Sequence, residues 1–481
     1  MRNWLEITSK VNNYSLFWKG GGGVKKVSTI THILGGKKLK KTQVFKRGIL
    51  TLAATAALGV AVLSVPTPFT GESVIAYAAE ETAEVSTIEE FDAALKNPAI
   101  TVINVNESIQ FKKNITNIPN RDLTINGNAD KGVVINSAHN SIYGKQNTKG
   151  KNTISIKNVN IVGADSDGRF FTGGSGNGPS SYGWDVYAEN VEYTGARFVH
   201  LSEGKLTFAG ENNINTRAEN AWVHDLEFLP GTIYNGIAAN KDHGQFSAFY
   251  FNGALIKGKA TGEVKIGSNA NVNVKIGPQS NVNHYYPVFY DKVQKVDIDS
   301  GATLDVDAAG VAFEFIPRAD YVNKFPSLNL ASGAKAYFNG RGGGDYPAMY
   351  LQYYGTQVNL SRNSELVVTG DSKKGAVRSE YKGAQINLDA PRNFEIKNKK
   401  AGAQLFYSTD TTINAKNVGR LSTWGRTGGD YLDPATNLFN ARNFTVNFGK
   451  ICNSKTLSVT GLPEDFRMED YGKISLKGGA I

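Results

Sequence analysis

Pairs of apolar residues separated by one polar residue recur through the second half of the chain. The first residues of five such pairs occupy equivalent places in successive repeats: Val264, Val296, Leu328, Val358 and Ile386. Eight residues after each of them a second pair begins, at Val272, Leu304, Ala336, Leu366 and Phe394. Side chains of a β-strand point alternately to its two faces, so each pair predicts a short strand with one inward face. We expect Val296, Leu328, Val358 and Ile386 to stack in one interior column.

A third apolar stretch precedes most of these pairs, and turn-forming residues separate the strands. Such stretches lie at 248–251, 287–290 and 348–351, and Ser300-Gly301 is typical of the turns. Three short strands in a repeat of about 30 residues indicate a solenoid, whereas a propeller needs four strands over about 40 residues. We therefore predict an all-β fold, a right-handed parallel β-helix over residues 86–450.

The segment before the first predicted strand has the pattern of a short amphipathic helix. Ser86 and Glu89 have the spacing of a capping box, and Ile88, Phe91 and Leu95 share one helical face. Such a helix would cover the apolar end of the first coil.

The last part of the chain repeats less regularly. Ile413 and Val446 indicate two further, more degenerate repeats, and residues 451–481 are expected to form a C-terminal β extension. The residues before Ile481 contain no sorting motif or wall-binding module. Two explanations stay open, namely attachment through another element or a truncated reading frame.

Residues 1–78 are expected to be a leader. A cluster of lysines precedes the uncharged run Gly48–Val65, and the small-x-small pattern Ala76-Tyr77-Ala78 follows it. This order is that of a secretory signal peptide cleaved after Ala78, with an uncleaved anchor as the alternative. No membrane span is expected after cleavage, and residues 79–85 would form a linker.

The leader also explains the charge of the chain. The formal net charge is +10, but the eleven Lys and Arg residues of 1–78 face only Glu6 and Glu72. The remaining chain is therefore close to neutral, which argues against a nucleic-acid partner. Cys452 is the only cysteine, so an intrachain disulfide and a CxxC metal site are excluded. Translation is expected to start at Val24 or Val27 and not at Met1.

The sequence resembles the pectate-lyase-like adhesive domain proteins of Listeria, enterococci and lactobacilli. The resemblance covers about residues 84–450. It rests on the capping segment Ser86–Leu95 that leads into Thr101–Val105, and on Asn152–Ile161, Glu189–Gly195 and Leu206–Ile214. It implies a β-helix on the surface of a Gram-positive cell, often followed by a WxL wall-binding domain. This chain departs from that layout because it ends before any such domain.

The resemblance raises the question of lyase chemistry, which needs carboxylates that hold calcium and a basic residue near the substrate. Trp222-Val223-His224-Asp225 reverses the last two residues of the lyase signature Trp-x-Asp-His, and reversal in a strand sends each side chain to the opposite face. Arg318 and Asp242-His243-Gly244 resemble single fragments of lyase and hydrolase sites without their partners. Asp165-Ser166-Asp167-Gly168 resembles part of a calcium loop, but position 176 is Gly. We therefore expect no catalytic residues, no metal site and no cofactor.

Aromatic residues are the better candidates for binding. Tyr350, Tyr353, Tyr354 and Trp424 come from neighbouring repeats beside Gly-rich segments, and flat rings suit sugars or protein contacts. The alternative is that these rings pack against the core while the hydroxyl groups stay in water.

The sequence favours a secreted or cell-surface adhesin that presents a rigid, non-catalytic β-helix to extracellular glycans or surface proteins. Contact with peptidoglycan would need a missing or separate module. A polysaccharide lyase or glycoside hydrolase acting on uronate polymers and a structural wall-layer protein are the alternatives. Three clustered carboxylates with one basic residue would favour the enzyme, and an aromatic strip without carboxylates would favour the adhesin.

Overall fold

The computed structural model divides the chain into two units, residues 1–80 and 81–481. It describes four strands of the first unit, and it describes the second unit except for residues 167, 174–182, 202, 241–245, 252–261, 278–286, 317–324, 343, 382, 451–452 and 479–481. In the first unit β1 (Ile7–Thr8) pairs antiparallel with β2 (Asn13–Tyr14), and β3 (Ile30–Leu34) pairs antiparallel with β4 (Lys37–Lys41).

The apolar run Gly48–Val65 of the predicted signal peptide and its cleavage site after Ala78 lie outside the described residues. Within the part of the chain that is described, no helix has both the length and the apolar character that a membrane span requires.

The second unit begins with β5 (Glu81–Val85), α2 (Ile88–Lys96) and β6 (Ile100–Val105). β5 pairs in parallel with β6, so the segment expected to be a linker contains a strand of the first coil. Phe91 and Leu95 of α2 are fully buried, and the partly buried Ile88 packs against the same hydrophobic core, as the helical pattern predicted.

The capping box of α2 lies one residue later than predicted. Thr87, not Ser86, is the N-cap: its backbone is extended, and its hydroxyl accepts a hydrogen bond from the Glu90 amide at 3.2 Å. The Glu90 carboxylate accepts from the Thr87 amide at 3.1 Å and also from the Ser86 amide at 2.8 Å. The prediction with Ser86 and Glu89 was wrong because both starting residues are good caps and glutamates stand at both third positions.

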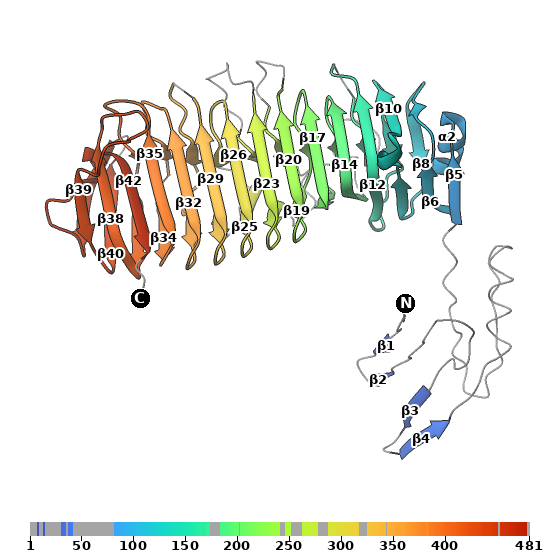
Figure 1. Cartoon of the computed structure of the whole chain (residues 1–481), viewed down its shortest axis with the longest axis horizontal. Helices are drawn as coiled ribbons and strands as arrows, with labels where there is room; N and C mark the ends of the chain where they lie inside the picture. The colour runs from blue at the N-terminus through green and yellow to red at the C-terminus, as the bar shows by residue number, and fades with distance from the viewer. Residues whose placement is uncertain are drawn as a thin grey trace. The chain divides into compact units, whose positions relative to one another are not determined.

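The coils of the second unit are built from three faces, which form a parallel β-helix (Figure 1). Strands of the first face are β9 (Leu123–Asn126), β12 (Asn152–Gly163), β14 (Trp184–Gly195), β16 (Lys205–Ala209), β19 (Asp225–Phe228), β22 (Gly262–Ile266), β25 (Val293–Ile298), β28 (Ser327–Leu330), β31 (Gln357–Leu360), β34 (Ala384–Asp389) and β37 (Thr411–Lys416). Strands of the second face are β7 (Ile109–Gln110), β10 (Val134–Ala138), β17 (Glu211–Thr216), β20 (Ile233–Ala238), β23 (Asn271–Ile276), β26 (Thr303–Ala308), β29 (Lys335–Gly340), β32 (Glu365–Gly370) and β35 (Asn393–Asn398). The long strands β12 and β14 continue from the first face onto the second, since β14 pairs with both β16 and β17.

The third face consists of shorter strands in two sheets. The seven-stranded sheet contains β8 (Ile115–Ile118), β11 (Ile142–Gly144), β13 (Phe171–Thr172), β15 (Val199–His200), β18 (Ala221–Trp222), β21 (Phe249–Phe251) and β24 (Phe289–Asp291). The four-stranded sheet contains β27 (Phe313–Phe315), β30 (Met349–Leu351), β33 (Val377–Ser379) and β36 (Phe406–Ser408).

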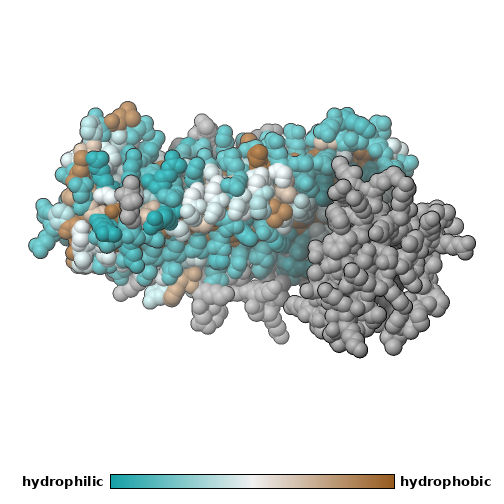
Figure 2. Space-filling model, turned by 60° about the horizontal axis from the view of Figure 1, so that its bottom comes forward, coloured by the Kyte–Doolittle hydropathy of each residue, from teal (hydrophilic) through white to brown (hydrophobic). Residues whose placement is uncertain are grey.

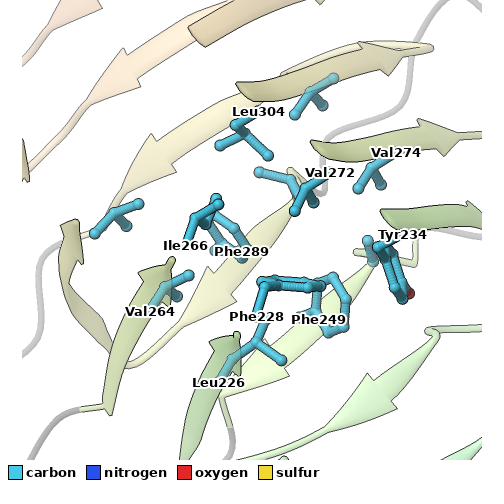
Figure 3. Close-up of a cluster of buried hydrophobic side chains, with 14 of the residues drawn as sticks. Leu226, Phe228, Tyr234, Phe249, Val264, Ile266, Val272, Val274, Phe289 and Leu304 are labelled. Carbon is cyan, nitrogen blue, oxygen red and sulfur yellow. The ribbon is translucent and has the colours of Figure 1, made fainter. Parts of the chain in front are cut away.

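The predicted interior columns are confirmed by the strand register. On the first face Val296 is paired with Leu328, Leu328 with Val358, and Val358 with Ile386. On the second face the column runs in the same way through residues that are each almost fully buried: Val272, Leu304, Ala336, Leu366 and Phe394. Figure 3 shows residues of both faces meeting the third-face rings of Phe249 and Phe289 in the core. Stacked aromatic pairs such as Phe208 and Phe228, with centroids 5.4 Å apart, extend along the coils.

The parallel stack ends at β37, and the remaining strands are antiparallel. These strands are β38 (Val418–Gly425), β39 (Asn437–Asn440), β40 (Phe444–Lys450), β41 (Asn453–Thr460) and β42 (Tyr471–Gly478). Val446 faces Ile413 in an antiparallel pair, so the expected further repeat at Val446 is wrong in direction. The pattern could not reveal this, because inward residues alternate in the same way in parallel and antiparallel strands. β42 also pairs antiparallel with β35 and β38, and these strands form the C-terminal end of the second unit (Figure 1).

Candidate functional site

The third-face strands carry a second set of residues that lie in register, on the side opposite to their inward-pointing phenylalanines. The side of the second unit seen in Figure 2 is mainly hydrophilic, with hydrophobic residues in small separate patches. In the seven-stranded sheet the aligned residues are Tyr143, Thr172, His200, Trp222, Tyr250 and Tyr290. In the four-stranded sheet they are Glu314, Tyr350, Arg378 and Tyr407.

The second run continues the first along the axis of the β-helix. The Val288 amide donates to the Ala312 carbonyl at 3.0 Å, which brings Tyr290 and Glu314 to equivalent positions two residues later. Their neighbours on the same strands, such as Phe289 and Phe313, are fully buried and point inward. We call the ten aligned residues from Tyr143 to Tyr407 the third-face column.

Aromatic rings contact one another along the first run of the column. The rings of His200 and Trp222 meet edge to face with centroids 4.5 Å apart, and Trp222 and Tyr250 meet in the same way at 5.0 Å. Tyr250 and Tyr290 are stacked at 5.6 Å with an interplanar angle of 20°. These contacts hold each ring in one orientation, so the surface is formed before any ligand arrives.

A buried cluster of charges lies beside this aromatic run. Arg197 Nη2 and Glu219 Oε2 are 2.5 Å apart, and the Arg197 guanidinium lies 4.4 Å from the Trp222 ring centroid. Arg169 Nη1 donates to His200 Nδ1 at 3.0 Å, because a guanidinium can only donate. Burial, with the nearby charges of Arg169 and Arg197, lowers the pKa of His200 to about 3. The imidazole is therefore neutral near pH 7.

In the second run, Tyr350 is 5% exposed and is covered by Arg378, whose guanidinium carbon lies 4.9 Å from the Tyr350 ring centroid. Arg378 also lies 5.5 Å from the Tyr407 ring centroid and forms an ion pair with Glu380. Glu314, at the start of this run, is almost fully buried. The sequence had singled out Tyr350 as a ring available for contact, and the structure makes it part of a packed column instead.

The other predicted tyrosines lie at the corner between the third and first faces. Tyr353 and Tyr354 follow β30, and Tyr354 is 55% exposed. Its ring lies 5.9 Å from that of Phe325, which is 54% exposed, and Tyr381 of the next coil is 46% exposed. We call Phe325, Tyr354 and Tyr381 the aromatic corner. The sequence reasoning missed Phe325 and Tyr381, although each stands, like Tyr354, two or three residues before a first-face strand.

Trp424 belongs to a different part of the structure. It lies on β38 among the antiparallel end strands, where its indole donates to the Asp433 carbonyl at 2.8 Å. Lys473 Nζ lies 4.5 Å from its ring centroid. The four residues proposed from the sequence therefore come from three separate places.

The fragments that resembled enzyme signatures are also separated. Trp222 is on the third face, whereas Asp225 begins the first-face strand β19, and the intervening His224 contacts Asp225 at 3.0 Å. Arg318 and Asp242-His243-Gly244 lie outside the described residues. Within the described ranges, no group of three or more His, Cys, Asp or Glu side chains is arranged to hold a metal ion.

Residues 82–200 match the model of a protein family described as "Putative pectate lyase-like adhesive domain". The resemblance seen in the sequence is confirmed over these residues, which include the N-terminal coils and the column as far as His200. No curated protein sequence matches the chain.

Three solved structures are similar to the structure of this chain. The L. reuters 100-23 SRRP has 12% sequence identity and a TM-score of 0.47, with 70% of this chain and 99% of that chain covered. The L. reuteri 53608 SRRP has 14% identity and a TM-score of 0.30, with 69% and 98% covered. ORF18 of Geobacillus virus E2 has 9% identity and a TM-score of 0.23, with 95% and 86% covered. Because all three TM-scores are below 0.5, nothing about the function of this chain follows from them.

Proposed function

We propose that the protein is an exported surface adhesin that binds glycans or proteins on its third face without catalysing a reaction. The observation that carries this proposal is the contiguous ring contact from Trp222 through Tyr250 to Tyr290, three partly exposed residues of the third-face column. Its neighbouring charges are paired or stacked on rings, as in Arg197 with Glu219 and Trp222. The match of residues 82–200 to an adhesive-domain family supports the same function.

The physical advantage of such a surface is rigidity. Each ring is held by strands that are hydrogen-bonded to both neighbouring coils, so little side-chain freedom is lost when a partner binds. Rings on a preformed scaffold also bury a large area for few rotatable bonds. The predicted signal peptide would place this surface outside the cell, on the secreted protein or at the cell wall.

The test uses purified residues 79–481 on an array of extracellular glycans and on immobilised surface proteins. The variant Tyr250→Ala plus Tyr290→Ala removes two partly exposed rings from the column. The control is Tyr337→Ala, a partly exposed tyrosine that faces outward on the second face. We expect the double variant to lose binding and the control to retain it.

A parallel assay tests the alternative that the protein is a polysaccharide lyase or hydrolase. The protein is incubated with polygalacturonate, alginate and hyaluronan, with and without calcium, and ultraviolet absorbance and reducing ends are followed. Sustained product formation would overturn the adhesin and establish a lyase or hydrolase. Absence of both binding and product would overturn it in favour of a structural wall-layer protein.

A further inference from the structure

The outer surface of the first face is hollowed by two adjoining concavities. One, of about 460 Å³, lies over Lys295, Phe325 and Gln357, and the other, of about 830 Å³, lies over Asn387 and later residues. Asn359 lines both, so the two concavities continue into one another along the stacked strands. We call this continuous surface the first-face groove.

A ladder of side-chain amides runs along the floor of this groove. Asn329 Nδ2 donates to Asp297 Oδ1 at 2.8 Å, and Asn359 donates to Asn329 at 2.8 Å. Asn387 donates to Asn359 at 2.8 Å, and Asn414 donates to Asn387 at 3.0 Å. Every coil from β25 to β37 thus contributes one side chain, and all the amides point in the same direction along the rod.

The ladder leaves hydrogen-bonding capacity on each amide. An asparagine side chain has two N–H donors and two acceptor lone pairs. Among the described residues, the ladder occupies one donor and one acceptor of Asn359 and of Asn387. Both side chains are partly exposed and line the groove, so this remaining capacity can serve a ligand there. A hydroxyl group, which both donates and accepts, is the complementary partner.

Charge and aromatic groups narrow the class of ligand. Lys295 is paired with Asp297 at one end of the groove, and Asp389 accepts a hydrogen bond from Asn417 at 2.8 Å at the other. Glu263 and Lys416 also line the groove, so two carboxylates and two lysines balance in formal charge, which favours an uncharged ligand over a polyanion. Phe325 belongs both to the groove and to the aromatic corner, where its ring and that of Tyr354 are more than half exposed. Such rings stack on the apolar face of a sugar.

We propose that the first-face groove binds an uncharged, extended, β-linked polysaccharide that lies along the rod with about one sugar unit per coil. Neighbouring strands are about 4.8 Å apart, a repeat comparable with that of one sugar unit in an extended chain. The amides of Asn359 and Asn387 bind hydroxyl groups on successive units, and Phe325 with Tyr354 stacks on a terminal unit. This site lies on a different face from the third-face column and does not depend on it.

The test is calorimetric titration of residues 79–481 with two neutral probes, cellohexaose and β-1,4-mannohexaose. The variant Asn359→Ala plus Asn387→Ala should weaken binding of the preferred probe by about tenfold or more, because two ligand hydrogen bonds are lost. The matched control is Asn235→Ala plus Asn273→Ala, which breaks a similar ladder on the second face, where the donor-acceptor distances are 2.9 and 3.2 Å. The control should leave affinity unchanged within a factor of two, while both variants lower the melting temperature to a similar extent.

A second variant tests the stacking of aromatic rings on the sugar without disturbing the asparagine ladder. Phe325→Ala plus Tyr354→Ala removes exposed rings, so it should weaken binding severalfold without changing the melting temperature. Failure of both neutral probes to bind would overturn the proposed site, as would equal losses in the two asparagine variants. Tighter binding of hexagalacturonate through the same residues would overturn the proposal that the ligand is uncharged. None of these results would affect the third-face column, whose own binding test uses Tyr250 and Tyr290.

Discussion

The guanidinium carbon of Arg378 lies 4.9 Å from the ring centroid of Tyr350, its register partner on the preceding coil. This contact places a cation over a ring that a reading of the sequence alone would leave open to ligands. Arg378 is itself held by Glu380 and by the ring of Tyr407. Tyr350 therefore stabilises the column, whereas Tyr354, four residues later, is available for contact.

The two tyrosines should differ in their effect on stability. Tyr350→Ala removes an almost fully buried ring and should lower the free energy of unfolding by on the order of 3 kcal/mol. Tyr354→Ala removes an exposed ring and should cost less than about 0.5 kcal/mol. Urea unfolding of both variants checks this, and equal midpoints would contradict the assigned burial.

The interior column predicts a large effect of a buried charge. Val358 is fully buried between Leu328 and Ile386, so Val358→Asp should lower the free energy of unfolding by on the order of 4 kcal/mol. The neighbouring Gln357 faces outward on the same strand, and Gln357→Asp should cost less than about 1 kcal/mol. Thermal unfolding measured by circular dichroism distinguishes the two, and a Val358→Asp protein that melts like the parent would refute the register.

The position of the capping box can be tested by a pair of conservative changes. Thr87→Ala removes the hydroxyl that accepts from the Glu90 amide and should cost about 1 kcal/mol. Ser86→Ala removes a hydroxyl that makes no capping bond to α2 in the described structure, and should be nearly neutral. Denaturation midpoints of the two variants give the answer, and the reverse order of effects would restore Ser86 as the cap.

The buried imidazole of His200 predicts a loss of stability in acid. Its pKa is lowered to about 3 in the folded protein, whereas the unfolded chain regains a value near 6.5. Between these values the unfolded state binds more protons, so stability falls as the pH drops, by up to roughly 1.4 kcal/mol per pH unit. His200→Asn keeps an acceptor near Arg169 but cannot be protonated, and should reduce this slope. Urea unfolding at pH 7, 5.5 and 4 measures it, and an unchanged slope in the variant would rule out His200 as its source.

The leader predicts one defined cleavage. Signal peptidase should cut after Ala78, because Ala76 and Ala78 stand at the small-residue positions behind the apolar run Gly48–Val65. N-terminal sequencing of protein recovered from the culture medium should begin at Ala79. Protein that remains in the membrane with residues 1–78 attached would show that the run is an anchor.

The aromatic corner and the third-face column show why candidate sites were harder to predict than strands. Successive column residues are unequally spaced in the sequence: Tyr250 and Tyr290 are far apart, while Tyr350 and Arg378 are closer, because segments of different length separate the third-face strands. No fixed period aligns them. The register that brings them together is set by backbone pairing between coils, and the burial of Tyr350 follows from a residue on another coil.

The sequence by itself determined the strands, the interior columns and the parallel β-helix, because alternation of apolar and polar residues is local and repeats at a nearly constant spacing on the first and second faces. Val296 and Leu328 could be matched in this way without coordinates. Only the tertiary structure decided the antiparallel direction of Val446 against Ile413, since both directions bury the same alternate side chains. It also decided which rings are open, because exposure depends on neighbours from other coils: Arg378 covers Tyr350, while the ring of Tyr354 is left beside Phe325 at the surface.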